Sequence, residues 1–125
     1  MGTVSADIPD LKGNWTEEKL VGVMHNKDFF NSTSELDHWV ISSQEENIIL
    51  GINYFTDGAE IIEEPIAGVI SPDGKTVSIA DASGGMYTAY LTDDETLIIQ
   101  YVNTGDKKGE SNYAFAFEQV LKKAE

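Results

Sequence analysis

The sequence predicts an all-β fold: a single antiparallel, eight-stranded, up-and-down β-barrel. Short apolar runs alternate with turns rich in glycine and aspartate about every ten to twelve residues, a spacing typical of an antiparallel sheet. No alternating helical segments call for a parallel sheet. The last run is apolar on both faces, with Tyr113, Phe115 and Phe117 on one face and alanines on the other. A two-sheet sandwich would show a cleaner division between apolar and polar faces, so a barrel is favoured.

Eight apolar runs define the expected strands. They cover residues 12–24, 38–43, 47–55, 60–70, 75–82, 86–92, 95–102 and 112–122. The polar segment 25–37 is expected to form a long connection, with a short helix near residues 31–36. Pro65 lies inside the fourth run. Because proline cannot donate to the strand ladder, Pro65 should mark a bulge, a strand edge or a break between two short strands.

The turns give the clearest local signals. The Ser-Pro-Asp-Gly segment at 71–74 predicts a hairpin, because proline presets the turn, aspartate accepts backbone hydrogen bonds and glycine supplies the left-handed residue. Asp57-Gly58 readily adopts the positive φ angles of a tight hairpin. The Ser-Gly-Gly segment at 83–85 and the pair Asp93-Asp94 predict two further turns.

Length and composition indicate one soluble globular domain. A chain of 125 residues buries enough surface for its own core. Residues 1–9 are expected to be a flexible lead-in, and residues 10–125 the barrel domain. No apolar run approaches the roughly 20 residues that cross a bilayer, and no signal sequence begins the chain. The compartment stays open, with a secreted or cell-surface location expected if a signal segment has been removed.

The chain is strongly acidic. It carries 22 acidic and 8 basic residues, a formal net charge of −14 that repels phosphate backbones and excludes nucleic-acid binding. We interpret the acidity as a solvated surface, with a bound cation or cationic ligand as the alternative. The absence of cysteine excludes disulfides, thiolate nucleophiles and zinc–thiolate sites. The oligomeric state stays open, a homo-oligomer included.

The sequence contains no recognisable catalytic or metal-binding set. His25 and His38 do not belong to a spaced metal motif. Adjacent carboxylates such as Glu63 and Glu64 point to opposite faces of a strand, so they do not form a catalytic pair. The Asp-Gly turns lack the alternating oxygen ligands of a calcium loop. We therefore expect no catalytic residue, no metal and no cofactor.

Three segments resemble a known superfamily. Residues 10–15, Asp-Leu-Lys-Gly-Asn-Trp, resemble the Gly-x-Trp opening of the calycins, which include lipocalins, fatty-acid-binding proteins and avidins. Residues 38–41 and 68–76 are similar to small lipocalin-like domains of prokaryotic, especially archaeal, surface proteins. The resemblance covers residues 10–123 and implies an eight-stranded barrel with room for a small molecule. The asparagine and serine with which avidins contact biotin are missing after Trp15, where Thr-Glu-Glu-Lys stands.

Aromatic side chains are the candidate ligand-binding residues, because a small-molecule pocket needs apolar walls and a few placed polar groups. These candidates are Trp39, Tyr54, Tyr87, Tyr101 and Phe115. Glu17, Lys19 or a tyrosine hydroxyl would orient a polar group of the ligand. Gly13 and Trp15 are expected to plug one end of the barrel, the indole N–H bonded to a carbonyl; direct ligand contact is the alternative for Trp15. Core packing is the alternative for the five candidates.

Three classes of function follow from this interpretation. The first is non-catalytic binding of a small, largely apolar ligand inside the barrel. The second is a structural or protein-interaction module with a filled barrel. The third is a small-barrel isomerase or cyclase, which the lack of a catalytic set places last.

Overall fold

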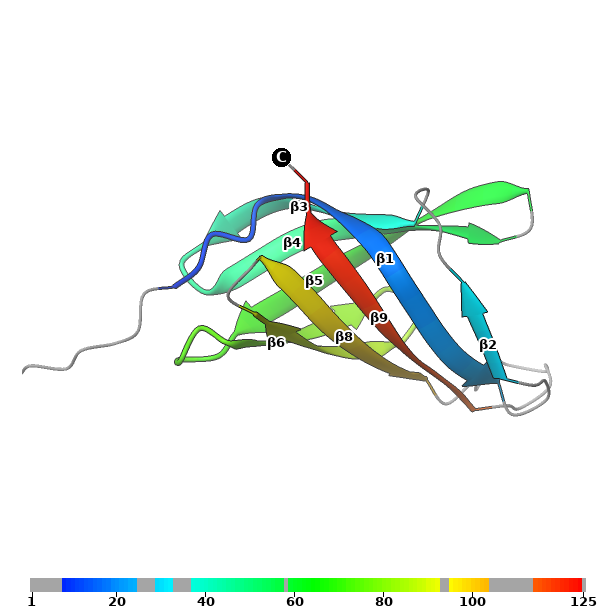
Figure 1. The fold of residues 1–125 in the computed structure, drawn as a ribbon. Helices are drawn as coiled ribbons and strands as arrows, with labels where there is room; N and C mark the ends of the chain where they lie inside the picture. The colour runs from blue at the N-terminus through cyan, green and yellow to red at the C-terminus, as the bar shows by residue number, and fades with distance from the viewer. Residues whose placement is uncertain are drawn as a thin grey trace, which may run out of the picture.

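The computed structural model describes residues 8–24, 29–32, 37–57, 59–92, 95–103 and 114–124, and these form one antiparallel sheet (Figure 1). Its strands are β1 (Gly13–Met24), β2 (Phe29–Ser32), β3 (His38–Glu45), β4 (Ile48–Asp57), β5 (Glu60–Ile70), β6 (Thr76–Asp81), β7 (Met86–Leu91), β8 (Thr96–Asn103) and β9 (Phe115–Lys123). No helix occurs in the described residues, and therefore none that could span a membrane.

The sheet closes into a barrel. Strands β3 to β9 pair with their sequence neighbours, β1 pairs with β3, and β1 also pairs with β9 from Trp15 to Met24. Eight strands, β1 and β3 to β9, thus form a closed up-and-down barrel, in which the first and last strands lie side by side (Figure 1). The predicted fold class and the count of eight barrel strands are confirmed.

Strand β2 corrects one sequence-based expectation. The predicted helix near residues 31–36 is wrong at its start, because residues 29–32 form a strand that pairs with Leu20–Val23 of β1. Residues 33–36 lie outside the described residues. β3 pairs with the beginning of β1, over Gly13–Thr16, and leaves the second half of that long strand without a partner on this side. β2 occupies that edge, where ladder hydrogen bonds to β1 and the high β propensity of Phe29 and Phe30 both favour a strand.

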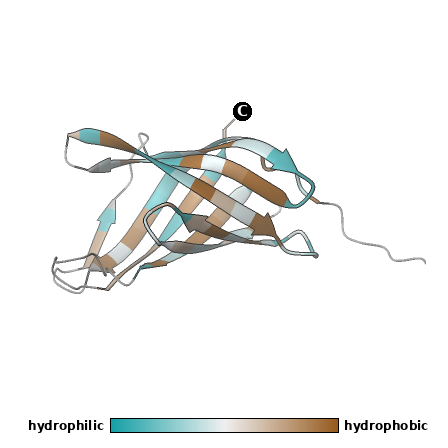
Figure 2. Ribbon diagram, turned by 180° about the vertical axis from the view of Figure 1, so that it is seen from behind, coloured by the Kyte–Doolittle hydropathy of each residue, from teal (hydrophilic) through white to brown (hydrophobic). Residues whose placement is uncertain are grey.

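Side chains alternate between the inside and the outside of the barrel, as the repeating hydropathy along the strands indicates (Figure 2). In β8, Leu97, Ile99 and Tyr101 are buried, whereas Gln100 and Val102 are exposed. The register shifts between Glu17 and Lys19 in β1 and between Ile41 and Ser43 in β3. These β-bulges change which positions face inward beyond them.

The strand containing Pro65 is continuous. β5 runs from Glu60 to Ile70, and Pro65 pairs with Ile52 of β4. The ladder to β6 begins only at Ile66, and the Ala82 N–H after β6 donates to the Pro65 carbonyl at 3.2 Å, so Pro65 lies at the edge where that ladder ends. Of the three alternatives, the edge position is therefore correct, and it leaves the missing N–H without consequence.

Two sequence-predicted features organise the end of the barrel where β1 begins, which we call the Trp15 end. At the 71–74 turn, the Gly74 N–H donates to the Ser71 carbonyl at 2.9 Å, and Gly74 has a φ of 74°. Trp15 is 1% exposed, and its indole N–H donates to the Leu11 carbonyl at 2.9 Å. The Leu11 N–H in turn donates to Gln44 Oε1 at 2.8 Å, which fixes the segment before β1 against β3.

Candidate ligand-binding cavity

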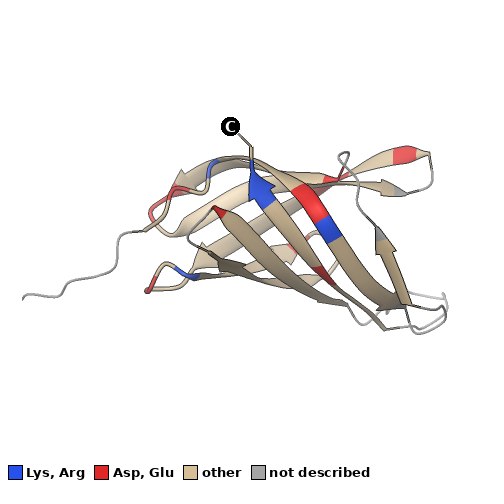
Figure 3. Cartoon of the chain, viewed as in Figure 1, with Lys and Arg blue, Asp and Glu red and all other residues tan. Residues whose placement is uncertain are grey.

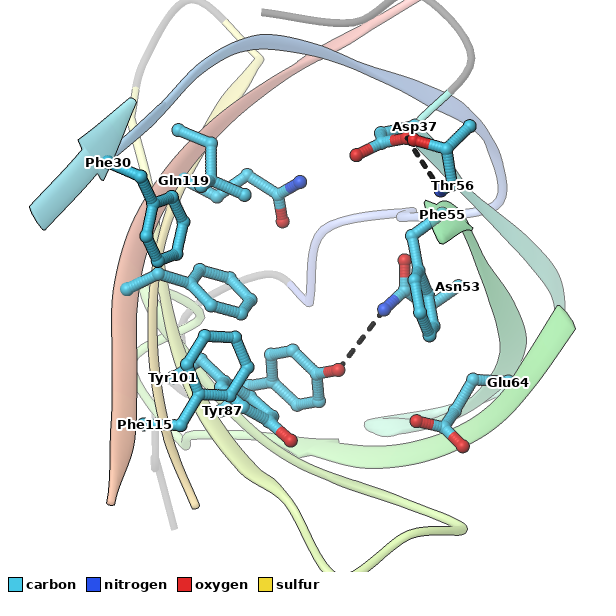
Figure 4. Close-up of a pocket in the computed structure, with 12 residues that line it drawn as sticks. Phe30, Asp37, Asn53, Phe55, Thr56, Glu64, Tyr87, Tyr101, Phe115 and Gln119 are labelled. Carbon is cyan, nitrogen blue, oxygen red and sulfur yellow. Dashed lines mark hydrogen bonds between the residues drawn. The ribbon is translucent and has the colours of Figure 1, made fainter. Parts of the chain in front are cut away.

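A cavity of about 290 Å³ lies inside the other end of the barrel, which we call the cavity end (Figure 4). Side chains from β1, β2, β4, β5, β7, β8 and β9, together with the residue before β3, form its wall. The lining residues are Leu20, Phe30, Asp37, Asn53, Phe55, Thr56, Glu64, Tyr87, Tyr101, Phe115, Phe117 and Gln119. Most of them occupy inward positions of their strands, so the cavity is part of the barrel interior.

One side of the cavity is aromatic. Tyr101 stacks on Phe117 with ring centroids 4.7 Å apart, and Phe115 meets Tyr101 edge-on at 5.7 Å. Tyr87 lies 4.4 Å from Tyr101, and Phe30 of β2 lies 6.3 Å from Phe115. Because these rings contact one another, they form a continuous apolar wall on this side of the cavity (Figure 4).

Two glycines make room for these rings. A Cβ atom on Gly22 of β1 would lie 2.7 Å from both Phe30 Cζ and Phe117 Cβ. A Cβ atom on Gly85 would lie within 2.3 Å of the Tyr101 ring. Both glycines therefore allow an aromatic ring to lie directly against the backbone, which sets the position of the aromatic wall.

The facing side of the cavity is acidic and polar (Figure 4). Asp37 is 9% exposed, and its Oδ1 accepts hydrogen bonds from the Thr56 N–H at 3.0 Å and the Thr56 hydroxyl at 3.1 Å. Asp37 Oδ2 accepts no hydrogen bond from the part of the chain that the structure describes. Glu64 Oε2 accepts a hydrogen bond from the Ser83 hydroxyl at 2.6 Å. Both carboxylates are thus held in place at the cavity surface.

Tyr87 connects the two sides. Its hydroxyl donates to Asp81 Oδ2 at 2.9 Å and accepts from Asn53 Nδ2 at 3.1 Å. Asp81 Oδ1 also accepts from the Gly85 N–H at 2.7 Å. Burial and then the nearby Asp81 charge raise the pKa of Tyr87 far above its ordinary value, so the phenol stays protonated at neutral pH. Tyr87 therefore acts as a fixed hydrogen-bonding group and not as a base.

A further buried acid lies beside the cavity. Glu17 is 4% exposed, and its Oε1 accepts a hydrogen bond from Nε2 of the lining residue Gln119 at 2.7 Å. The bulge after Glu17 turns Lys19 outward, where it is exposed. Of the three groups expected to orient a ligand, Lys19 is therefore excluded, because the bulge ends the inward alternation of β1 after Glu17 and leaves Lys19 on the outside.

The structure brings together three of the five predicted ligand-binding residues. Tyr87, Tyr101 and Phe115 line the cavity. Trp39 is fully buried and meets Tyr87 edge-on at 5.3 Å, but it does not line the cavity. Tyr54 occupies an outward position of β4 and stacks on His38 at 4.7 Å. Ligand contact by the three lining residues stays a prediction, and the other two could act only indirectly.

Gly13 and Trp15 lie away from the cavity. Gly13 begins β1 with a φ of 132°, a conformation that favours glycine. Trp15 pairs with Trp39 across β1 and β3, and Lys123 Nζ lies 5.7 Å from the centroid of the Trp15 ring. These positions fit the expected plug, whose contribution to stability stays a prediction.

The sequence analysis missed the polar lining of the cavity. A usable signal exists for Asn53, which lies in an apolar run two residues after Gly51 and four after Ile49, both buried. Gln119 likewise lies two residues before the buried Leu121. A polar residue at an inward position of a strand therefore indicates a polar interior site. Asp37 gives no such signal, because it precedes the strand.

A second hollow lies near the rim, with a volume of about 590 Å³. It is lined by Val23, Gly84, Met86, Val102, Asn103, Ala114, Phe115 and Ala116, several of which are exposed apolar side chains. It shares only Phe115 with the interior cavity among the described lining residues. The interior cavity is the better candidate site, because it combines apolar walls with several placed polar groups.

Comparison with protein-family models, with curated proteins and with solved structures found no significant match. Within the described ranges, no group of three or more histidine or acidic side chains is arranged to hold a metal ion.

Proposed function

We propose that this barrel binds a small, largely apolar molecule in its interior cavity without changing it chemically. The observation that carries the proposal is the cavity, whose aromatic wall includes Tyr87, Tyr101 and Phe115. Its volume of about 290 Å³ is close to the lower end of the range for small-molecule sites. Hydrogen-bonding groups on the opposite wall would orient the ligand.

The resemblance to the calycins is consistent with this proposal. The Gly-x-Trp opening at residues 13–15 begins the first strand of a closed eight-stranded barrel. In barrels of this size the interior is just wide enough for packed side chains or for one small ligand. We propose that this chain combines the two, with packed side chains at the Trp15 end and a ligand at the cavity end.

The alternatives have less support. An interaction module with a filled barrel would need the space beside Tyr101 and Phe117 to be occupied by the chain's own side chains. An isomerase or cyclase would need a group of suitable pKa for proton transfer, and the raised pKa of Tyr87 keeps that phenol protonated. The cavity and its neutral hydroxyl groups thus favour binding over both alternatives.

Native mass spectrometry of the protein purified from its own source is the direct test. A retained small molecule, released on unfolding, would support the proposal and identify its ligand class. A second test is a titration of the purified protein with 2-phenylethanol, in which NMR of the aromatic side chains reports binding. Binding in the cavity should shift the signals of Tyr87, Tyr101 and Phe117, because all three rings line the cavity.

A pair of variants makes this titration specific. Leu20→Trp would place a large ring in the cavity, whereas Val21→Trp would place the same ring on the outer face, where Val21 is 42% exposed. We expect Leu20→Trp to abolish the shifts and Val21→Trp to keep them, with both variants folded by circular dichroism. Equal binding by both variants would contradict the assignment of the ligand to the interior.

A further inference from the structure

We propose that the polar end of the ligand is a hydrogen-bond donor, a hydroxyl or N–H group, and that the cavity disfavours molecules that only accept hydrogen bonds. This inference rests on the proposed function and adds the hydrogen-bonding class of the ligand to it. Two features carry it. Three oxygens that line the cavity have no donor, and neighbouring carboxylates fix the orientation of the two amides to which two of these oxygens belong.

The three oxygens accept no hydrogen bond from the described part of the chain. They are Asp37 Oδ2, Asn53 Oδ1 and Gln119 Oε1. Their side chains are almost fully buried, with exposed fractions of 9%, 7% and 4% respectively. Figure 4 shows the Gln119 amide pointing into the cavity from β9, on the side away from Asp37 and Asn53. These side chains therefore present unsatisfied acceptors to a ligand.

The orientation of the Asn53 amide follows from its neighbours. The Tyr87 hydroxyl donates its one hydrogen to Asp81 Oδ2 at 2.9 Å, since a carboxylate can only accept. The hydroxyl oxygen can then only accept, and it does so from Asn53 Nδ2 at 3.1 Å. This bond turns the amide nitrogen toward Tyr87 and leaves the amide oxygen without a partner. The acceptor at this position is therefore set by the buried Asp81.

The same arrangement occurs at the other two side chains. Gln119 Nε2 donates to the carboxylate oxygen Oε1 of Glu17 at 2.7 Å, which fixes the amide and leaves Gln119 Oε1 over. Asp37 Oδ1 accepts both the N–H and the hydroxyl of Thr56, so Oδ2 is left over. Each amide nitrogen thus already donates to the protein, whereas each amide oxygen accepts nothing from the described residues.

A ligand donor would satisfy these acceptors. A ketone or an ether would instead place its own oxygen against a protein oxygen, and both would lack a donor in a buried site. A buried polar group without a partner costs free energy, so a site that hydrogen-bonds a hydroxyl rejects an analogue that lacks one. The aromatic wall offers apolar contact to both classes alike. The acceptors therefore decide between them.

Three neutral probes with one phenyl ring and the same number of non-hydrogen atoms test this preference. 2-Phenylethanol donates and accepts, acetophenone only accepts, and propylbenzene does neither. Each is titrated into the full chain at pH 7, with NMR of the aromatic side chains as the readout. The described acidic residues are spread over several strands (Figure 3), and uncharged probes remove their effect from the comparison. We expect the alcohol to bind at least about tenfold more tightly than the ketone, a difference of about 1.4 kcal/mol.

The variant Asp37→Asn replaces one acceptor by a donor. The N–H and hydroxyl of Thr56 should hold the new amide oxygen at the place of Oδ1, which puts the amide nitrogen at the place of Oδ2. We expect acetophenone to bind this variant at least about threefold more tightly than it binds the wild type, and the preference for the alcohol to fall. An unchanged affinity for propylbenzene would show that the cavity is intact.

Two glutamines give a matched pair of variants. Gln119 donates to Glu17 inside the barrel, and Gln100 donates to Glu118 at 3.1 Å on the exposed face of β8 and β9. Gln119→Leu should weaken binding of 2-phenylethanol and keep that of propylbenzene, because it removes an acceptor and retains apolar volume. Gln100→Leu should change neither affinity. Circular dichroism checks that both variants fold.

The outcomes separate this inference from the proposed function. If acetophenone binds the wild type as tightly as 2-phenylethanol does, the donor inference is overturned and the proposed function stands. A preference for the alcohol that is unchanged in both Asp37→Asn and Gln119→Leu would also overturn it, because two of the three assigned oxygens would then contribute nothing. If none of the three probes shifts the cavity signals, both the inference and the proposed function fail.

Discussion

The two ends of the barrel are built from the same strands, yet they differ in how their interiors are filled. At the Trp15 end, Leu11, Trp15, Ile70, Leu97 and Leu121 are each no more than 2% exposed. Apolar side chains fill this end, and the polar atom of Trp15 is bonded to a nearby carbonyl. At the cavity end, acids and amides replace aliphatic side chains at inward positions, and space remains between them and the rings.

Two paired tryptophans mark the change between these ends. Trp15 and Trp39 are cross-strand neighbours and both are fully buried. The Trp15 N–H has an acceptor, whereas the Trp39 N–H, next to Tyr87, has none among the described residues. The comparison indicates that the Trp15 end is closely packed, whereas the cavity end leaves part of its interior unfilled. We therefore expect the Trp15 end to supply more of the stability, and we propose the unfilled space as the binding site.

Trp15→Ala should have the largest effect on stability. Removal of a fully buried indole leaves a cavity in a packed region, and we expect a loss of about 3–5 kcal/mol in the free energy of unfolding. Phe30→Ala, at the partly exposed rim of the cavity end, should lower it by only about 1–2 kcal/mol. Urea unfolding measures both. A loss below about 1 kcal/mol for Trp15→Ala would contradict the stabilising role of this end.

Tyr87→Phe should have the next largest effect. It removes the donor to Asp81 and the acceptor for Asn53, so two buried polar groups lose a partner, at about 1–3 kcal/mol. Tyr90→Phe is the matched control, because Tyr90 lies on the outer face of the same strand and is 43% exposed. In thermal unfolding, Tyr87→Phe should have a clearly lower melting temperature than Tyr90→Phe. Equal melting temperatures would mean that the hydrogen bonds of Tyr87 with Asp81 and Asn53 do not stabilise the cavity end.

The ends also differ in how well the sequence predicts them. The Trp15 end and the turn at Gly74 follow from local signals, since Gly-x-Trp and Ser-Pro-Asp-Gly each constrain a few neighbouring residues. The alternation of residues predicts that Phe115 and Phe117 share one face of the last strand, and both line the cavity. Features that depend on the alternation of side chains along a strand, or on a short turn motif, are therefore predictable from this sequence.

The acidic side of the cavity and β2 could not be predicted in the same way. β2 pairs with the second half of β1, which β3 leaves without a partner, and this free edge is a property of the closed sheet that no local pattern shows. The bulge after Glu17 moves Leu20 inward and Lys19 outward, which no alternation pattern shows. Tyr54 was selected for its ring, but its position two residues from the outward Ile52 turns it away from the interior. These features depend on register, which only the assembled barrel fixes.

A smaller effect is expected at high pH. The raised pKa of Tyr87 means that the folded protein holds this proton more tightly than the unfolded chain, whose tyrosines ionise near pH 10. The resulting stability is fully present below about pH 10 and declines above it. The difference in unfolding free energy between wild type and Tyr87→Phe should therefore be constant from pH 7 to 9 and narrow toward pH 11. A difference that stays constant to pH 11 would show that Tyr87 ionises normally.

The smallest expected effect is that of metal removal, which should leave the melting temperature unchanged. A metal bound only by the folded state would stabilise it by mass action, so chelation by excess EDTA would lower the midpoint. The described residues offer no group of three or more candidate ligands for a metal ion. Scanning calorimetry with and without EDTA measures the shift. A drop that calcium or zinc reverses would assign an inorganic ion to the protein. The double variant Asp37→Asn with Glu64→Gln would then show whether that ion lies in the cavity, because the EDTA effect would disappear in this variant only if these two carboxylates hold it.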